Sequence, residues 1–386
     1  YEPNNDALPD FPKANLELKV TGLKSKQNEP PVAKERLTLN LINYFDIVGE
    51  TFESSSFFLK CQKLLILCYR HEETAKAYDQ KFTAQQFIYK FAEHDLAVIK
   101  RDWEFIQKKV REGKAHELSE GDTFFLKANR KGAGGDKDWT GQPYSDQLAY
   151  RRGWSFNSQF LTALIRTHAG ESTNVVSGLS EIEQAVELCF RRYYGVETED
   201  LFSRFNLVNS EGKISKSVRY DLAKRLLAEG GISLQDLGAA GIKLKTVRLK
   251  ASGATRESMS FPAFDYEQIS NQRWEDSDFS AALEEKFLFV VFREDGAGNE
   301  RLLHAGYWNM PYVDRQQAKT VWDASKASIL DGSYVFPGEA LSDVAHVRPH
   351  GRTARDVAKC PDGNYRVKRC FWLNKKYIEQ VISTLI

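Results

Sequence analysis

The sequence predicts an α/β protein in which one domain, a mixed sheet flanked by helices, occurs twice along the chain. Three observations lead to this prediction. Residues 64–69 (LLILCY) are a short, continuous apolar run, typical of a buried central strand. Residues 95–112 carry apolar side chains at helical spacing, with Lys and Arg opposite and Gly113 as the stop. Landmarks of the first half then recur in the second half.

Five landmarks recur in the same order. Asp10 lies seven residues before Glu17, and Asp236 lies seven residues before Lys243. The other four pairs are the apolar runs 64–69 and 287–292, the helices around Trp103 and Trp322, the basic turns at Arg130 and 346–351, and the segments 151–165 and 367–382. Chance is a poor explanation for five ordered pairs, so we interpret the second half as a copy of the first.

The domain boundaries follow from this duplication. We expect a first domain over residues 1–170, a linker and helical segment over 171–235, and a second domain over 236–386. Within the middle segment, residues 180–194, 201–206 and 217–229 are predicted to be helices. In the second copy, a long and mostly helical segment precedes Asp236, whereas in the first copy only nine residues precede Asp10. We therefore expect that a helical arm belonging before the first copy is absent from this sequence.

The remaining elements of the first domain are predicted from local pattern. Residues 36–45 alternate as a strand, with Leu37, Leu39 and Leu41 on one face. Residues 123–129 are a second strand, residues 145–152 a short helix, and residues 156–168 an apolar-striped element that closes the domain.

Composition limits the partners of the chain. Its 386 residues contain 54 Lys plus Arg and 53 Asp plus Glu, so any nucleic-acid site must be a local patch. The five cysteines show no CxxC spacing, which favours reduced thiols of a cytoplasmic protein over a zinc site. No apolar run approaches the about 20 residues of a membrane helix, and we expect no membrane partner.

The opening stretch carries the candidate catalytic chemistry. Side chains alternate along a strand, so Glu17 and Lys19 share one face, while Leu18 and Val20 lie on an apolar opposite face. The carboxylates of Asp10 and Glu17 suit a hard cation such as Mg²⁺, and the lysine can orient an attacking water. The pattern therefore suits metal-assisted attack on a phosphate.

Spacing alone leaves alternatives open. A solvated strand face with an incidental ion pair explains Glu17 and Lys19 as well. The same Glu-x-Lys spacing occurs in two Gly-containing turns and at residues 284–286. Residues 284–286 lie at the start of a predicted strand and are therefore an alternative candidate for the metal site. Lys60, just before the apolar run, is either a solvated strand end or a functional lysine.

Two basic segments are candidate DNA contacts. Residues 127–152 contain six basic and three acidic residues around a Gly-rich turn, where the backbone can approach a partner closely. A flexible hairpin tip is the alternative. Residues 341–386 contain nine Lys plus Arg against four Asp plus Glu, a patch of the size that DNA backbone contacts require. Arg152 and Arg352 are included as DNA-binding candidates.

Several stretches carry a resemblance to a known family. DFPKANLELK followed by VTGL resembles the catalytic strand of MutH, the nicking endonuclease of mismatch repair. KERLTLNLINY, SSFFLKCQKLLI, QPYSD and HVRPH are still more similar to the Sau-type restriction endonucleases, which carry two MutH-like domains in one chain. The resemblance implies a restriction-endonuclease-like fold, Mg²⁺ as cofactor and double-stranded DNA containing GATC as substrate.

The resemblance also implies roles for individual residues. Asp10 and Glu17 would bind Mg²⁺, with the backbone carbonyl of Leu18 completing the metal shell. Lys19 would serve the attacking water, and Lys60 matches an additional active-site lysine. The family carries a further acid on its upstream arm, which nothing in this sequence replaces, so we expect activity to depend on that arm.

Base-reading residues are implied in both copies: Asn129, Arg130 and Lys131 in the first, and Arg348, Pro349 and His350 in the second. The family has Arg-Pro-Lys at this loop, so Lys131 matches its lysine. Asn129 and Arg130 differ from the family pattern, so which of them contacts a base is left open. Lys243 replaces the metal-binding glutamate with positive charge, so we expect the second copy to be non-catalytic. Residues 284–286 align with the approach to a central strand and are set aside as a metal site.

These inferences predict a type II restriction endonuclease whose second copy is a DNA-binding allosteric effector. A palindrome is read by a two-fold arrangement, and one chain holds one competent metal site, so we expect self-association on DNA. A mismatch-repair nickase is one alternative, although it needs only one domain. A non-catalytic protein with two DNA-binding domains is the other.

Overall fold

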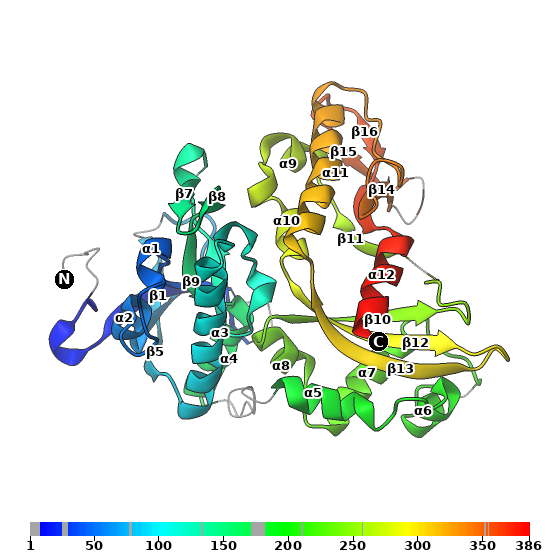
Figure 1. Cartoon of the computed structure of the whole chain (residues 1–386), viewed down its shortest axis with the longest axis horizontal. Helices are drawn as coiled ribbons and strands as arrows, with labels where there is room; N and C mark the ends of the chain where they lie inside the picture. The colour runs from blue at the N-terminus through cyan, green and yellow to red at the C-terminus, as the bar shows by residue number, and fades with distance from the viewer. Residues whose placement is uncertain are drawn as a thin grey trace. The chain divides into compact units, whose positions relative to one another are not determined.

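The computed structural model describes residues 8–24, 30–76, 79–132, 134–170, 182–209, 211–256, 258–350, 353 and 355–386. The chain divides into two compact units (Figure 1). Unit 1 comprises Tyr1–Ala185 with Ile232–Lys243, and unit 2 comprises Val186–Gly231 with Leu244–Ile386. No helix of the described residues has the length and apolar character needed to cross a membrane.

Unit 1 is built from three small sheets flanked by helices. The first sheet has the order β2-β1-β4-β5, the second β3-β9-β6, and the third is the pair β7-β8. The strands are β1 (Glu17–Lys24), β2 (Val32–Ala33), β3 (Leu37–Leu41), β4 (Lys63–Arg70), β5 (Lys81–Lys90), β6 (Leu126–Arg130), β7 (Trp139–Gln142), β8 (Ser145–Tyr150) and β9 (Arg152–Phe156). The helices are α1 (Tyr44–Ile47), α2 (Ser56–Cys61), α3 (Glu93–Arg111), α4 (Ser158–His168) and α8 (Leu234–Ala239).

Unit 2 repeats this plan. Its sheets have the orders β10-β12-β13, β11-β17-β14 and β15-β16. The strands are β10 (Ile242–Leu249), whose first two residues are grouped with unit 1, β11 (Met259–Ala263), β12 (Lys286–Glu294), β13 (Glu300–Asn309), β14 (Ala345–Pro349), β15 (Val357–Lys359), β16 (Tyr365–Val367) and β17 (Arg369–Leu373). The helices are most of α5 (Ile182–Arg191), then α6 (Thr198–Arg204), α7 (Val218–Glu229), α9 (Tyr266–Asn271), α10 (Asp278–Leu283), α11 (Tyr312–Leu330) and α12 (Lys375–Leu385).

The sheets and the long helices of the two units correspond in order, which agrees with the predicted duplication. Helices α3 and α11 both have 19 residues, and α4 and α12 both have 11. Trp103 and Trp322 stand at the same position of their helices, and both are buried. Just beyond β6, the Lys131 N–H donates to the Arg151 carbonyl at 2.7 Å. Just beyond β14, the His350 N–H donates to the Lys368 carbonyl at 2.8 Å, so His350 is the counterpart of Lys131.

Buried apolar strands form the centre of each unit, as predicted. In unit 1, Leu64 and Ile66 of β4 are fully buried, and β4 lies between β1 and β5. In unit 2, Phe287 and Phe289 of β12 belong to one large buried cluster. Helix α12 packs on β13 and α11 packs on β14, covering this sheet system (Figure 1).

The middle segment is shared between the units. Residues 186–231, which carry α6 and α7, are grouped with unit 2. Helix α8 is grouped with unit 1, where it packs on α4, and the Asn157 amide donates to the Ala239 carbonyl at 2.7 Å.

Two predicted elements are wrong. Residues 145–152 form β8 and the start of β9 and not a helix, because Tyr144, with φ of +64°, turns the chain into a hairpin after β7. The strand predicted over residues 36–45 ends at Leu41. Asn43 stops it, since its side chain accepts the Phe45 N–H at 3.0 Å and caps α1.

The apolar face predicted for the opening strand is partly exposed. Val20 is 48% exposed, whereas Glu17 on the opposite face is 3% exposed. In unit 2, Leu244 of β10, the counterpart of Leu18, is buried, whereas Leu18 is half-buried. Alternation therefore predicted which side chains share a face, but not which face is covered.

Asp102 is expected to be a major stabilising residue of unit 1. Its buried carboxylate accepts the N–H groups of Phe124, Phe125 and Leu126 at 3.1, 2.7 and 3.0 Å, and burial raises its pKa. We expect Asp102→Ala to lower the free energy of unfolding by about 3 kcal/mol, because three buried donors lose their acceptor. Urea denaturation measures this, with the exposed Glu104→Ala of the same helix as the control. Equal stabilities for the two variants would contradict the anchoring role.

Candidate active site

A tight turn brings Asp10 back beside Glu17. The turn Pro12–Ala14 leads to Asn15, whose φ of +47° reverses the chain, and Phe11 then pairs with Leu16. Glu17 Oε2 accepts the Asp10 N–H at 3.1 Å. Asp10 Oδ2 in turn accepts the Leu18 N–H at 3.0 Å. The backbone N–H of Asp10 thus fixes the Glu17 carboxylate, and the backbone N–H of Leu18, the residue after Glu17, fixes the Asp10 carboxylate.

Two lysines from different elements meet at Glu17. Lys19 Nζ lies 2.9 Å from Glu17 Oε1 and also donates to the Leu39 carbonyl at 2.5 Å. Lys60 Nζ, from the end of α2, lies 3.9 Å from the same carboxylate oxygen. The parallel pairing of β1 with β4, in which Glu17 lies opposite Leu64, carries Lys60 to this position. The structure therefore brings together all four predicted catalytic side chains.

The cluster is almost closed to solvent. The side chains of Glu17, Lys19 and Lys60 are 4, 15 and 12% exposed. Behind them, the fully buried Cys61 lies within electrostatic range of both carboxylates and both lysines, and burial raises the pKa of its thiol to about 12. The thiol therefore stays protonated near neutral pH and serves as packing, which agrees with the reduced state predicted for it.

The donor set fits a hard divalent cation. Two carboxylates fixed through one oxygen each, with the Leu18 carbonyl between them in sequence, are the oxygen ligands that Mg²⁺ takes, and Mg²⁺ keeps waters for the rest of its shell. Within the described part of the chain, no group of three or more His, Cys, Asp or Glu side chains is placed to hold a metal. The assignment of Asp10, Glu17 and Leu18 as ligands stays a prediction.

The predicted reading loop lies next to this cluster. Lys131 Nζ donates to Thr38 Oγ1 at 2.7 Å, one residue before the Leu39 carbonyl that holds Lys19. Burial lowers the pKa of Lys131, and the positive charges of Arg36 and Lys19 act in the same direction. The aliphatic part of Lys131 lies over Gly153, where a Cβ would come within 3.3 Å of it. Strand β3 thus connects the loop to the candidate catalytic lysine.

The glycines of the loop have separate structural reasons. A Cβ at Gly132 would stand 2.1 Å from Cγ of Asp138, whose carboxylate accepts the Gly134 N–H at 3.0 Å. Gly134 and Gly135 have φ of +103° and +109°, which L side chains rarely adopt. Beside the loop is a pocket of about 480 Å³ whose lining includes Lys131 and three further cationic residues, Lys137, Arg151 and Arg152.

Two predicted DNA-binding residues of unit 1 are buried. The Arg152 guanidinium is 4% exposed and donates to the carbonyls of Ala128, at 2.6 Å, and Leu118. Asn129 is 3% exposed, and its amide donates to the Arg130 carbonyl at 3.2 Å. These contacts give Arg152 a structural role and do not support the predicted DNA contact, because its donors are used inside the unit. Arg130 is half-buried above the Tyr150 ring.

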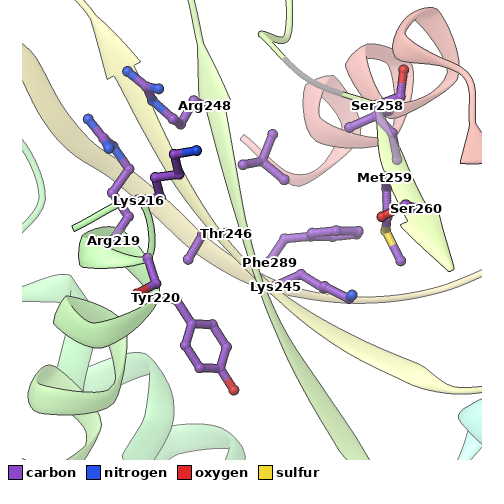
Figure 2. A pocket seen from close by; sticks show the side chains of 13 residues that line it. Lys216, Arg219, Tyr220, Lys245, Thr246, Arg248, Ser258, Met259, Ser260 and Phe289 are labelled. Carbon is purple, nitrogen blue, oxygen red and sulfur yellow. The ribbon is translucent and has the colours of Figure 1, made fainter. Parts of the chain in front are cut away.

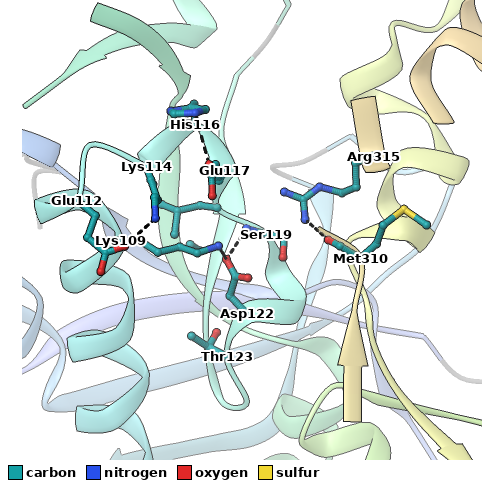
Figure 3. A network of polar contacts seen from close by, with 12 residues as sticks. Lys109, Glu112, Lys114, His116, Glu117, Ser119, Asp122, Thr123, Met310 and Arg315 are labelled. Carbon is teal, nitrogen blue, oxygen red and sulfur yellow. Dashed lines mark hydrogen bonds and ion pairs between the residues drawn. The ribbon is translucent and has the colours of Figure 1, made fainter. Parts of the chain in front are cut away.

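A polar network fixes the turn that precedes β6 (Figure 3). Lys109 Nζ of α3 lies 3.0 Å from Asp122 Oδ2, and the same carboxylate oxygen accepts the Ser119 N–H at 2.8 Å. Together with Asp102, these contacts set where β6 begins, and so where Lys131 emerges.

The candidate catalytic set is not repeated in the second copy of the domain, residues 236–386. Its Asp236 lies in α8, which is grouped with unit 1, where its carboxylate accepts the Ser233 N–H at 2.6 Å in a capping box, and its Lys243 is exposed. Ser55 and Ser277 cap the equivalent helices α2 and α10. The fifth residue after Ser55 is Lys60, and the fifth after Ser277 is Ala282. The second copy therefore differs from the first at the second lysine as well as at the glutamate.

The other predicted residues of unit 2 have varied surroundings. Arg348, Pro349 and His350 are exposed at the end of β14. Arg348 pairs with Glu339, and the His350 ring lies 5.9 Å from the Trp372 ring. The competitor at residues 284–286 is buried at the start of β12, and Arg352 lies outside the described residues.

Sequence reasoning missed the contribution of β3. Thr38 and the Leu39 carbonyl contact the two lysines that matter most, Lys131 and Lys19. A backbone carbonyl leaves no signal in the sequence, and Thr38 stood in a strand interpreted only by its leucines. The pairing of β3 with β9 places both groups.

Two comparisons place the chain among known proteins. The model of the family described as "DNA mismatch repair enzyme MutH" matches residues 1–102 and 228–321, together about half of the chain. Each match ends one residue before the corresponding tryptophan, Trp103 or Trp322, so the family pattern occurs once in each unit. The type II restriction enzyme Sau3AI of Staphylococcus aureus is 29% identical, over 99% of this chain and 90% of that protein. Both findings confirm the resemblance and the fold class expected from the sequence: the chain belongs to the family of the DNA mismatch repair enzyme MutH.

Proposed function

We propose that this protein is a type II restriction endonuclease that hydrolyses phosphodiesters of double-stranded DNA at GATC in the presence of Mg²⁺. One observation carries the proposal: Asp10, Glu17, Lys19 and Lys60 converge in unit 1, next to a loop that offers Lys131. Similarity to a type II restriction enzyme over nearly the whole chain supports it. Membership of the family of a DNA mismatch repair enzyme also supports DNA as the substrate.

The residues of unit 1 have distinct roles in this proposal. When bound, Mg²⁺ would supply positive charge to the scissile phosphate and lower the pKa of an attacking water. Asp10 and Glu17 hold the cation, and the backbone hydrogen bonds keep their carboxylates aligned before it arrives. Lys19 is fixed by the Leu39 carbonyl and orients the water. Lys60 is more distant from Glu17 and provides a second ammonium for the phosphate.

Unit 2 acts in this proposal as a DNA-binding allosteric effector. It lacks counterparts of Glu17 and Lys60 but keeps exposed cationic and aromatic groups at the end of β14. Occupation of unit 2 by one GATC site would favour the assembly of two chains on DNA, so that two catalytic units meet the palindrome. In this proposal, one GATC site bound by unit 2 promotes cleavage of another GATC site by unit 1.

A plasmid assay tests the proposal. We expect a two-site GATC plasmid to be linearised with Mg²⁺, a one-site plasmid to be cut at least about tenfold more slowly at dilute enzyme, and EDTA to stop both. Equal rates on one-site and two-site DNA would remove the effector role. Cleavage of only one strand, restricted to hemimethylated duplex, would identify a mismatch-repair nickase, and binding without any cleavage would identify a non-catalytic DNA-binding protein.

A further inference from the structure

Unit 2 contains a basic pocket of about 280 Å³ between the start of α7, strand β10 and strand β11 (Figure 2). Four cationic side chains line it: Lys216, Arg219, Lys245 and Arg248. Figure 2 shows Lys216, Arg219 and Arg248 gathered on one side of β10, and Lys245 on the other side beside Phe289. Thr246 and Tyr220 also line the pocket, and the Tyr220 hydroxyl points away from the three cations.

A carboxylate holds the two arginines in place. Glu300, whose side chain is 8% exposed, accepts from Arg219 Nε at 2.6 Å and from Arg248 Nε at 3.0 Å. Both of these contacts use the Nε atom of the guanidinium. Arg248 Nη2 also lies 3.9 Å from Glu294, which is itself paired with Arg256. The two guanidiniums are therefore pre-oriented, and their positive charge is only partly balanced.

Lys216 adds the third positive charge. Its side chain is exposed, and within the described residues it makes no ion pair. Two oriented guanidiniums and one ammonium can approach a tetrahedral anion from several directions, which suits a phosphate group better than a planar carboxylate. The pocket thus has the donors of a phosphate site without any metal ligand.

The pocket does not coincide with the counterpart of the active site. Strands β10 and β11 are the counterparts of β1 and β3, which hold the candidate active site of unit 1. Lys245 is the counterpart of Lys19, and Lys216, Arg219 and Arg248 lie on the other side of β10 from it (Figure 2). Their positive charges can attract a phosphate without the cation that two carboxylates would require.

We propose that this pocket binds a phosphate group directly and without metal, and that a phosphodiester of the DNA backbone is its source. The proposal extends the effector role given above to unit 2, but it does not require that unit 2 reads GATC. A free phosphate or nucleotide offers the same chemistry, and the experiment separates these sources.

Lysine labelling of the full chain in EDTA tests the proposal. Reductive methylation of Lys216, followed by mass spectrometry, is compared with that of Lys213, which lies on the same loop, is 76% exposed and does not line the pocket. The ligands are inorganic phosphate and a short duplex that lacks GATC. At a ligand concentration of about ten times Kd, we expect about tenfold slower labelling of Lys216 and unchanged labelling of Lys213.

Each outcome decides the proposal. Protection by both ligands, lost in the Arg219→Gln/Arg248→Gln variant, supports a phosphate pocket that holds DNA. Protection by inorganic phosphate alone supports the pocket and overturns DNA as its source. Equal protection of Lys213 and Lys216 by the duplex indicates general shielding and overturns the proposal, as does the absence of protection by either ligand. Because the duplex lacks GATC and metal is removed, failure of the nuclease assignment does not affect the result.

Discussion

Glu17→Gln is expected to reduce cleavage of GATC-containing DNA by about a thousandfold or more, while DNA binding without metal persists. The Glu17 carboxylate contacts Asp10, Lys19 and Lys60, at 3.1, 2.9 and 3.9 Å. The amide keeps the shape and can still accept the Asp10 N–H, but it removes the negative charge that would hold a cation. Binding without metal should be unchanged or tighter, because a charge that repels phosphate is lost.

A matched control exists within the chain. Glu211 and Lys213 have the same spacing and an ion pair of 2.8 Å, but their side chains are 67 and 76% exposed in a turn. Glu211→Gln should therefore cleave at the normal rate. Cleavage is measured by single-turnover kinetics on a labelled duplex, and binding by gel shift in EDTA. A normal rate for Glu17→Gln would show that the catalytic site lies elsewhere.

The candidate site was predictable because its chemistry is concentrated in short stretches. Asp10, Glu17 and Lys19 lie within ten residues, and Lys60 was assigned through the family resemblance, with the pairing of β4 and β1 bringing it to them. The duplication was predictable for a different reason: ordered landmarks survive even where Glu17 has become Lys243. The sequence pattern was sufficient both for the short catalytic stretch and for the duplication, because neither inference required the path of an individual loop.

Other features depend on long-range packing, which local pattern does not contain. The exposure of Val20 depends on which helices cover the sheet, and the burial of Arg152 depends on the carbonyls of Ala128 and Leu118. The hairpin at residues 139–150 was mistaken in part for a helix because the left-handed Tyr144 has no clear sequence signal. Thr38 was missed because it contacts a residue 93 positions away.

Lys131→Ala is expected to weaken discrimination between GATC and sites with one changed base by about 10- to 100-fold. Lys131 emerges where β6 ends, and its ammonium is held 2.7 Å from Thr38 Oγ1, ready to be released to a base edge. Its pKa is lowered by burial and by the charges of Arg36 and Lys19, so contact with an electronegative base edge relieves an unfavourable environment. The ratio of cleavage rates on matched and mismatched duplexes measures the effect.

Two further variants separate base reading from other contributions. Lys137 is exposed and lines the same pocket, so Lys137→Ala should weaken binding to all sequences equally and leave discrimination unchanged. His350 is the counterpart of Lys131 in unit 2, and His350→Ala should leave discrimination at a one-site duplex intact while reducing the advantage of two-site DNA. If His350→Ala and Lys131→Ala had the same effect on one-site DNA, the two units would share the reading of one site, and the division into catalytic and effector units would be wrong. The equivalent backbone positions of the two residues make this comparison direct, because each variant removes one side chain from the same place in the repeated fold.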